Sequence, residues 1–340
     1  MPQPTKLCVL PGDGIGPEVT AATMQVLAAM KLPIEWEEAE IGAEISVKYG
    51  TNLPPKTVDA VVRNRCALKG PTATAIGSGQ ASANVGLRKA LDLYANLRPV
   101  KNLPGVKTRY EDVDLVVVRE NTEDLYAGLE HIVVPGVVES LMFITEKAST
   151  HIAQFAFDYA RKNGRKKVSA VHKANIMKLS DGLFLDCCRR VSRAFPEVKY
   201  DEIIVDNCCM QLVRDPTQFD VLLMENLYGD IVSDLCAGLV GGLGVVPGAN
   251  IGETCAVFEA VHGTAPDIAG KGLANPSALM LAGAMLLDHI GQTDSARRLR
   301  DALYATLADE RVRTGDLGGR GTTKSFTDAV VARLGGQAVG

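Results

Sequence analysis

The sequence has no apolar run long enough to cross a membrane, no basic run and no acidic tail. Its longest strongly apolar run, 278–287, is far short of the roughly 20 residues that a transmembrane helix needs. The N-terminus passes almost directly into a strand-like segment, without the apolar core of a signal peptide. A net charge of −4 argues against a general nucleic-acid or membrane surface. We expect a soluble protein that binds neither nucleic acid nor membranes. It would reside in the cytoplasm, or in the mitochondrial matrix if a transit peptide has been removed.

Cysteines are present, but never at a spacing that indicates a zinc site or a redox motif. The eight cysteines include two adjacent pairs, 187–188 and 208–209, and no C-x-x-C. Without a secretory signal, we expect reduced and mostly buried thiols. Aromatic residues are few, at 5%, yet apolar residues make up 46% of the 340 residues. A chain of this length exceeds what one hydrophobic core usually holds, so we expect two lobes.

Strand-like and helix-like segments alternate in the N-terminal part of the chain. The apolar runs 6–10, 34–39 and 66–68 predict strands, and 59–65 reads as part of a helix. Such alternation is typical of an α/β fold.

The segment 11–19, PGDGIGPEV, joins the first strand to a helix that continues to about residue 30. Its glycine spacing does not match the G-x-G-x-x-G of a dinucleotide-binding loop, and Pro17 suits the first turn of a helix. We interpret it as a strand-to-helix turn that lines the cleft, and not as a Rossmann loop.

The stretch 219–244 carries two acidic residues at helical spacing. The apolar run 219–224 predicts a strand, Tyr228-Gly229 a turn, and a helix is expected from about Asp230. On that helix Asp230 and Asp234 lie on one face, where like charges repel unless a cation sits between them. Mg²⁺ or Mn²⁺ would suit these oxygens. The alternative is that Asp230 caps the helix and Asp234 faces solvent.

Three arginines are expected at the ends of regular elements. After a Thr/Ala/Gly/Ser-rich loop at 72–82, which suits a flexible ligand cover, a helix would project Ser82, Asn84 and Arg88 together. Arg98 follows on the next strand and Arg119 at the end of another. Each arginine alone is more typical of a surface ion pair. Converging, they would bind a substrate with several carboxylates.

Eight blocks of sequence, in order, resemble the β-decarboxylating dehydrogenases over essentially the whole chain. These blocks are PGDGIGPEV, SxNxxLR, DLYANLRPVK, VRENTEDLYAG, VHKANIMKLSDG, NLYGDIVSDLCAGLVGGLG, HGTAPDIAG and DLGG. Within that family the NAD-dependent isocitrate dehydrogenases resemble the chain most. The resemblance implies an isopropylmalate-dehydrogenase-like fold, which is not a Rossmann fold: two α/β domains sharing a large mixed sheet.

Members of the family oxidise a 2-hydroxy acid at C2 and then release the C3 carboxylate as CO₂. The resemblance implies that Asp206, Asp230 and Asp234 bind the divalent metal. Asp206 is expected at the end of a strand over 203–205. Lys173 would accept the hydroxyl proton, directly or through Asp206, and Tyr126 would protonate C3. Apart from the resemblance, Tyr126 reads as a packing aromatic and Lys173 as a solvated strand-end cation.

The resemblance also implies isocitrate as the substrate. Arg88, Arg98 and Arg119 would bind it together with Ser82 and Asn84, whose hydroxyl and amide suit a third carboxylate. Isopropylmalate dehydrogenases present an apolar surface there. Homoisocitrate is the nearer alternative, since one methylene is worth only about 1–3 kcal/mol of discrimination. A non-catalytic regulatory subunit of a heteromeric isocitrate dehydrogenase is the alternative from another functional class.

The cofactor is expected to be NAD. The loop 259–275 resembles the family's adenosine-binding loop. The residues that the resemblance places around the cofactor are Thr74, Asn175, His262, Gly263, Ala265, Asp267, Ile268 and Asn275. NADP-using relatives commonly have Lys and Tyr at positions 267 and 268. Here a carboxylate would accept hydrogen bonds from the ribose hydroxyls and repel a 2′-phosphate, and Ile268 offers no donor.

The resemblance further implies how the chain is divided and assembled. Residues 1–99 with 254–340 would form the cofactor domain, and 100–253 the dimerisation domain. The segment 131–145 has β-branched runs on both sides of Pro135-Gly136 and predicts a hairpin that clasps a partner. We expect a homodimer in which Lys173 and Asp206 complete the other chain's active site.

Overall fold

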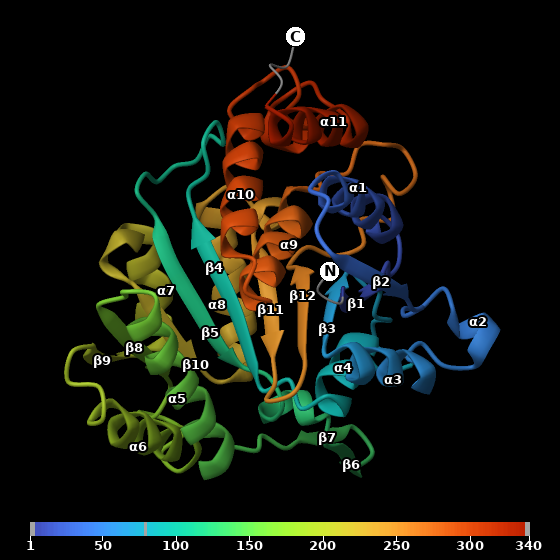
Figure 1. Ribbon diagram of the computed structural model, residues 1–340. Helices are drawn as coiled ribbons and strands as arrows, with labels where there is room; N and C mark the ends of the chain where they lie inside the picture. The colour runs from blue at the N-terminus through green and yellow to red at the C-terminus, as the bar shows by residue number, and fades with distance from the viewer. Residues whose placement is uncertain (1–3, 78–79, 337–340) are drawn as a thin grey trace.

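The structure is a computed structural model that describes residues 4–77 and 80–336, and within them ten strands form one mixed sheet (Figure 1). In order across the sheet these are β2 (Ile34–Glu38), β1 (Thr5–Leu10), β3 (Cys66–Lys69), β12 (Ala256–Ala260), β11 (Pro247–Ile251), β4 (Ala95–Lys101), β5 (Asp114–Glu120), β10 (Val221–Met224), β8 (Lys167–His172) and β9 (Lys199–Ile204). Strands β2, β1, β3 and β12 are mutually parallel, as are β5, β10, β8 and β9. The antiparallel strands β11 and β4 join the two parallel blocks. The predicted α/β fold with a large mixed sheet is confirmed.

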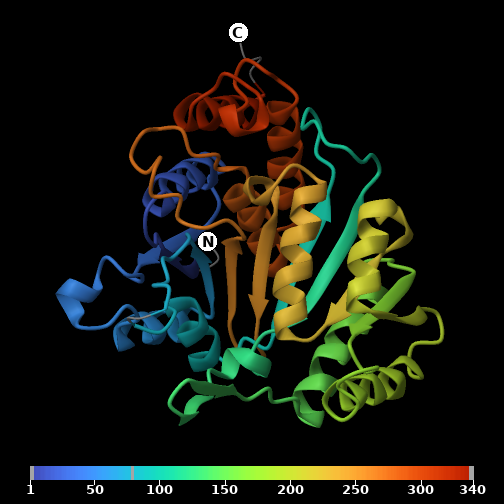
Figure 2. The ribbon, with the colours of Figure 1, turned by 180° about the vertical axis from the view of Figure 1, so that it is seen from behind.

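Helices cover both faces of this sheet. They are α1 (Gly16–Ala29), α2 (Ser46–Tyr49), α3 (Pro55–Asn64), α4 (Ala83–Ala90), α5 (Glu146–Lys162), α6 (Ser180–Ser192), α7 (Val205–Arg214), α8 (Asn226–Leu239), α9 (Ser277–His289), α10 (Thr293–Leu307) and α11 (Thr323–Leu334). Short 3₁₀ turns are η1 (Asp124–Ala127), η2 (Pro216–Gln218), η3 (Leu243–Val245) and η4 (Gly315–Leu317). Helices α9 and α10 lie on the face seen in Figure 1, whereas α7 and α8 come to the front when the molecule is turned (Figure 2). None of the helices within the described ranges is long and apolar enough to span a bilayer.

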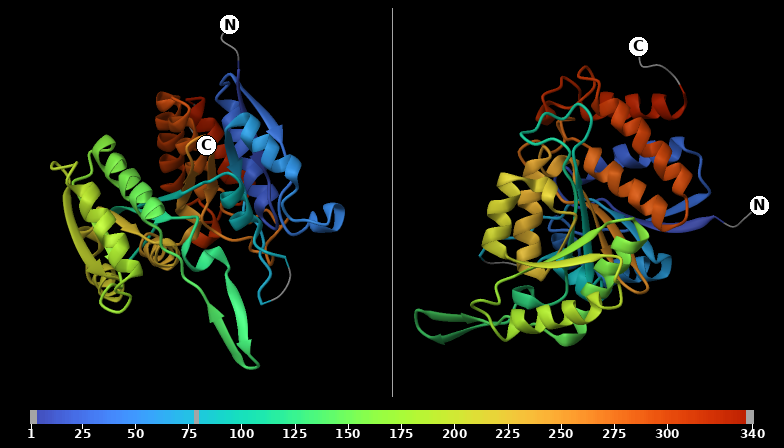
Figure 3. Two further views of the ribbon diagram at one scale, coloured as in Figure 1. Left: turned by 90° about the horizontal axis from the view of Figure 1, so that it is seen from below. Right: turned by 90° about the vertical axis from the view of Figure 1, so that its left-hand side faces the viewer.

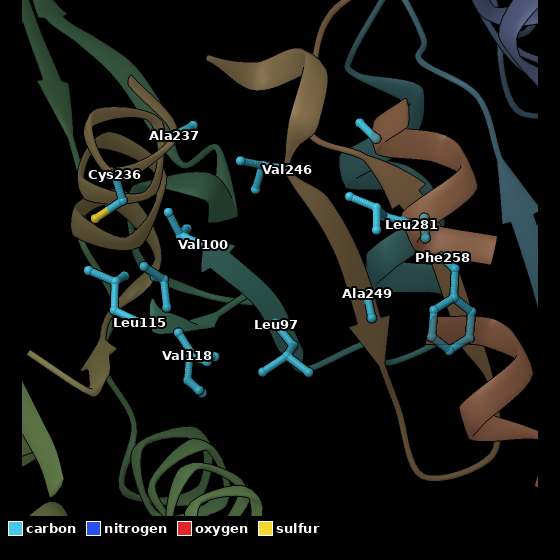
Figure 4. Close-up of a cluster of buried hydrophobic side chains, with 14 of the residues drawn as sticks. Leu97, Val100, Leu115, Val118, Cys236, Ala237, Val246, Ala249, Phe258 and Leu281 are labelled. Carbon is cyan, nitrogen blue, oxygen red and sulfur yellow. The ribbon is translucent and has the colours of Figure 1, made fainter. Parts of the chain in front are cut away.

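One large core packs against both faces of the middle of the sheet. Figure 4 shows Leu97 and Val100 of β4, Leu115 and Val118 of β5, and Phe258 of β12 among its members. Because alternate residues of a strand point to opposite faces, Leu97 and Val118 lie on one face of the sheet. Val100 and Leu115 lie on the other face, together with the polar Arg98 and Arg119 that contact α8. That alternation positions the site described below.

The predicted hairpin is present. Strands β6 (Glu130–Val134) and β7 (Val137–Ser140) pair around Pro135-Gly136, and the hairpin projects away from the rest of the molecule (Figure 3). All of its strand residues are exposed. The predicted domain boundary at 99/100 falls inside β4, so the sheet continues across it. The division of the chain into the two domains stays a prediction.

Two local predictions were wrong in their boundaries. Helix α8 begins at Asn226, four residues before the expected start at Asp230, so Tyr228-Gly229 is helical and not a turn. Gly229 is needed there because a Cβ would collide with the packed side chain of Arg119. Asp206 lies in the first turn of α7, not at a strand end, because β9 ends at Ile204. Of the predicted flexible loop 72–82, residues 78–79 lie outside the described residues.

Candidate active site

A polar cavity of about 230 Å³ lies on the α8 side of strands β4, β5, β11 and β12. The polar residues that line it include Lys69, Ser82, Asn84, Arg88, Asn96, Arg98, Arg119, Tyr126, Asp230, Asp234, Glu259, His262 and Gly263. All three predicted arginines are among them, although they are separated by up to 31 residues in sequence. The predicted convergence of the arginines is therefore present in a single chain.

Arg119, on β5, is the most buried of these arginines, with 1% of its surface exposed. Its Nε and Nη2 donate to Asn226 Oδ1 at 3.0 and 2.7 Å, and Nη1 contacts the Asp230 carboxylate. The guanidinium also lies 4.9 Å from the ring centre of Tyr126. Asn226, in the first turn of α8, thus fixes the orientation of a cation that lines the cavity.

Arg98, on β4, connects the two acidic residues of α8. Its Nη1 donates to Asp234 Oδ1 at 3.2 Å and to Ser233 Oγ at 2.5 Å, and its Nη2 lies 3.7 Å from Asp230. Contact of one guanidinium with both carboxylates confirms that Asp230 and Asp234 share a helix face. Asp230 does not cap the helix, because α8 begins at Asn226. Asp234 is exposed to solvent, as the alternative expected, but it is also paired with Arg98.

The cluster shifts the proton affinities of its members. Burial, with neighbouring Arg98 and Arg88, lowers the pKa of Arg119 to about 10. Burial alone would raise the pKa of Asp230, but Arg119, Tyr126 and Arg98 outweigh it and hold that pKa below its ordinary value. Burial raises the pKa of Asp234, and Arg98 offsets this only in part. The arginines therefore favour the charged form of Asp230 more strongly than that of Asp234.

Tyr126, in η1, points its hydroxyl at the same acidic pair. The hydroxyl donates to Asp230 Oδ2 at 2.6 Å. Burial and this carboxylate raise the pKa of Tyr126, because a phenolate beside an anion is unfavourable. The phenol therefore holds its proton inside the cavity at neutral pH.

A second buried network, which the sequence did not indicate, holds Arg88 of α4. Glu259, on β12, accepts from Arg88 at 3.2 Å, from Lys69 at 2.7 Å and from Asn250 at 2.7 Å. Burial alone would raise the pKa of Glu259, but Lys69 and Arg88 hold it well below its ordinary value. Asn96 donates to Asn250 at 2.8 Å and so links this network to Arg98. The only hint in the sequence was a charged residue inside each of two apolar strands.

Ser82 and Asn84 line the end of the cavity at the start of α4. Ser82 caps the helix by accepting from the backbone N–H of Val85 at 3.5 Å, and the Thr74 hydroxyl donates to it at 3.1 Å. Val85 lines the cavity beside them. This end is therefore mixed, and not wholly free of apolar surface as the sequence suggested.

The segment that follows β12 has features that suit a nucleotide. His262 and Gly263 line the cavity, and the buried Nε2 of His262 has no hydrogen-bond partner among the described residues. Burial lowers the pKa of His262, so the ring is neutral and can bond a ligand. Asp267 is exposed and lies in a turn. In this turn the Ile268 N–H donates to the Ala265 carbonyl oxygen at 3.1 Å. These residues fit the chemistry of a dinucleotide.

Asn275 lies at the far end of the same segment, and only 7% of its surface is exposed. Its amide donates to Asp316 at 2.9 Å and its carbonyl accepts from Ser277 N–H at 2.9 Å. The side chain is therefore held in one orientation.

Lys173 and Asp206 do not join the cavity. They contact each other beyond β8 and β9, and neither lines the cavity. Asn175, in the same loop as Lys173, is exposed. The contact with Lys173 lowers the pKa of Asp206. Within residues 4–77 and 80–336, no three His, Cys, Asp or Glu side chains are grouped to hold a metal. One chain thus brings together two of the three predicted ligands, whose oxygens suit Mg²⁺ or Mn²⁺.

Comparisons with known proteins place this arrangement in a family. A family model described as isocitrate/isopropylmalate dehydrogenase matches residues 6–330. The mitochondrial NAD isocitrate dehydrogenase catalytic subunit 5 of Arabidopsis thaliana is 55% identical over 332 residues, covering 97% of this chain and 89% of that protein. The chloroplastic 3-isopropylmalate dehydrogenase of Solanum tuberosum is 55% identical over 305 residues, covering 89% and 85%.

A solved structure shares the whole architecture. The crystal structure of isocitrate dehydrogenase from Methylococcus capsulatus is 49% identical and superposes with a TM-score of 0.94, covering 97% of this chain and 99% of that chain. Both the sequence and the fold therefore lead to one conclusion. The chain belongs to the isocitrate/isopropylmalate dehydrogenase family.

Proposed function

We propose that the protein catalyses the oxidative decarboxylation of isocitrate to 2-oxoglutarate and CO₂, with reduction of NAD. The observation that carries this proposal is the convergence of Arg88, Arg98 and Arg119 on one cavity, beside two carboxylates and a protonated phenol. Buried guanidinium groups bind carboxylates strongly, and three of them match a tricarboxylic acid.

In this reaction the hydride on C2 passes to NAD while the C2 hydroxyl loses its proton. The C3 carboxylate then leaves as CO₂, and C3 takes up a proton. Arginines 88, 98 and 119 would orient the substrate, and Tyr126 would give its proton to C3. Lys173 of a second copy would accept the hydroxyl proton, directly or through Asp206.

A divalent cation would be held by Asp230 and Asp234 together with Asp206 of the second copy. When bound, it supplies positive charge that makes the hydroxyl more acidic and stabilises the electrons left after CO₂ loss. The Tyr126 proton is suitably retained for its step, because burial and Asp230 raise the pKa of that phenol.

The substrate is tested by comparing kcat/KM for isocitrate, homoisocitrate and 3-isopropylmalate with NAD and Mg²⁺ or Mn²⁺. We expect isocitrate to lead, because Ser82 and Asn84 can bond a third carboxylate. Isopropylmalate is a serious competitor for two reasons. Val85 gives the cavity an apolar side chain, and the Solanum tuberosum relative, 55% identical, is named as a 3-isopropylmalate dehydrogenase. A higher kcat/KM for either competitor would overturn the substrate assignment.

The choice of cofactor is tested at Asp267 and Ile268. We expect the wild type to prefer NAD, since the exposed Asp267 carboxylate would repel a 2′-phosphate. The double variant Asp267→Lys/Ile268→Tyr should move kcat/KM toward NADP. A wild-type preference for NADP would contradict the assignment, and an unshifted double variant would place selectivity elsewhere. Thr74 and Asn175 remain predictions for the nicotinamide end.

The alternative is a regulatory subunit that binds ligands without turnover. The chain retains Tyr126, Lys173 and the three predicted carboxylate ligands, which favours a catalytic role. Purified protein assayed alone with isocitrate, NAD and metal decides between the two: absence of NADH formation would support the regulatory role. The Arabidopsis relative is named as mitochondrial; a cytoplasmic location for this chain stays a prediction.

For assembly we propose a homodimer whose sites are shared between copies. Exposed apolar residues support an interface, namely Met210 and Val213 on α7, Ile231 on α8, and Val134 and Val138 on the hairpin. Such residues are typical of a surface that another chain covers. Light scattering should give twice the chain mass, and a monomer that is fully active would exclude the shared site.

A further inference from the structure

The segment 11–18, which comprises the turn after β1 and the first residues of α1, has no part in the function proposed so far. The sequence predicted a strand-to-helix turn that lines the cleft. The residues predicted to bind the cofactor include Thr74 and the loop 259–275, but none of this segment. In the structure it lies between the two segments proposed to bind NAD, the loop that holds Thr74 and the loop 262–275. Its hydrogen bonds go to both.

Asp13 fixes the first of these segments. Only 2% of this residue is exposed, and its carboxylate accepts three backbone N–H groups. The donors are Ala73 at 2.7 Å, Ala43 at 2.9 Å and Glu44 at 3.1 Å. Its own N–H donates to Pro71 O at 2.8 Å. A buried carboxylate that accepts from several backbone N–H groups holds the loops that carry them in place. Such hydrogen bonds are stronger than those between neutral groups, because the acceptor is charged.

The next residues of the turn contact the second segment. Ile15 N–H donates to Thr264 O at 2.9 Å. Gly14 has a φ of +60°, and a Cβ there would collide with the Thr264 carbonyl. The glycine therefore allows the turn and the 262–268 loop to touch backbone to backbone.

Glu18, in the first turn of α1, holds the end of that segment. Its carboxylate accepts from Gly272 N–H at 3.2 Å and Ala274 N–H at 3.1 Å, and from the Thr323 hydroxyl. Ala274 immediately precedes Asn275, which is proposed to meet the adenosine. The same turn thus binds both segments, at one end through Asp13 and at the other through Glu18.

We infer that Asp13 and Glu18 are positioning residues for the dinucleotide, acting by holding the 71–74 and 262–275 segments at a fixed separation. The inference rests on the proposed cofactor function. Neither side chain lines the cavity, so neither contacts the substrate there. Loss of either carboxylate should weaken cofactor binding while leaving the arginine cluster intact.

The test compares Asp13→Ala and Glu18→Ala with the matched control Asp220→Ala. Asp220 also accepts two backbone N–H groups, Lys166 at 2.5 Å and Lys167 at 3.0 Å, but it precedes β10, outside both cofactor segments. We expect the calorimetric Kd for NADH to rise about 10- to 100-fold in Asp13→Ala and Glu18→Ala. The KM for isocitrate should change less than about threefold, and Asp220→Ala should change neither.

Amide hydrogen exchange gives a readout that does not depend on the cofactor. Without any ligand, Asp13→Ala should speed exchange in 71–77, and Glu18→Ala should speed it in 270–275. Asp13→Asn, which keeps the size of the side chain, should show the same pattern more weakly if Asp13→Ala does not fold. Exchange rates and Kd values no different from those of Asp220→Ala would overturn the inference. If the wild type failed to bind NADH, the proposed cofactor would be wrong, and unchanged exchange in the variants would separately refute the positioning role.

Discussion

Two parts of the proposed catalytic apparatus are built differently. In the cavity, Arg119 is 1% exposed at its side chain and Asp230 40%, and each has several partners. Beyond β8 and β9, Lys173 is 29% exposed and Asp206 68%, and their side chains contact mainly each other. The cavity is organised by the side chains of one chain alone. The Lys173–Asp206 pair, in contrast, remains exposed to solvent. The difference teaches that, in the proposed shared site, one folded chain organises only one of the two parts.

The largest effect should come from removing one group from each part. Lys173→Met and Tyr126→Phe should each lose about 10²- to 10⁴-fold in kcat, as is usual for general acid–base groups. Mixed and refolded together, they should regain about a quarter of the activity, since half the dimers are mixed and each has one intact site. Steady-state kinetics on the mixture measures this, and separated heterodimers should have about half of the wild-type activity. Heterodimers that form but remain inactive would show that each chain completes its own site.

Stability should respond differently to the loss of two predicted metal ligands. Asp230→Ala should lower the free energy of unfolding by about 1–3 kcal/mol, because it leaves buried Arg119 and Arg98 short of a partner. Asp206→Ala should leave it unchanged, because its pairing with Lys173 is exposed. Urea unfolding without metal or substrate measures both. Equal losses of unfolding free energy in the two variants would mean that Asp230 and Asp206 contribute equally to the stability of the fold.

A pH-dependent effect is expected where the two parts meet. Glu225, just before α8, is 2% exposed, and neither carboxylate oxygen has a hydrogen-bond partner among the described residues. Burial, with Asp181, Asp124, Glu123 and Glu120 nearby, raises its pKa from 4.5 to about 9. Asp181 also accepts the Lys173 backbone N–H at 2.6 Å, so this acid adjoins the open part.

Because the pKa of Glu225 is higher in the folded state, the folded protein keeps a proton that the unfolded chain releases. Its contribution to stability is full below about pH 4.5 and is lost as the pH rises through about 9. The slope from this group is at most about 1.4 kcal/mol per pH unit. In Glu225→Gln, unfolding measured from pH 5 to 9 should depend less on pH. Parallel curves for the two proteins would show that Glu225 titrates normally.

The sequence predicted the side chains that line the cavity better than those that hold them in place. Arg119 comes at the end of an apolar run, so its place near the end of β5 could be inferred from the pattern. Arg98 was also expected at the end of a regular element, but it lies in the middle of β4. Asn226 and Glu259 could not be found in this way. Their partners, Arg119 and Lys69, lie 107 and 190 residues away in sequence, and such pairs are decided by the packing of the sheet.

The start of α8 shows how a local pattern can mislead. Tyr228-Gly229 has the composition of a turn, yet it lies within the helix because Arg119 packs where a side chain at 229 would be. Tertiary contact overrides local propensity here. Similarly, the separation of Lys173 and Asp206 from the cavity followed from the family resemblance, and no feature of the sequence alone indicated it.

The order of strands in the sheet also decides which strands can pair early during synthesis of the chain. Strand β3 leaves the ribosome early, but its neighbour β12 is made only at Ala256–Ala260. Strands β5, β10, β8 and β9 are all present before then and can pair among themselves. Until β12 arrives, β3 is an open edge with unpaired backbone groups. The first strands synthesised are therefore among the last to be enclosed, and a chain interrupted before β12 is left with an edge that can pair with other chains.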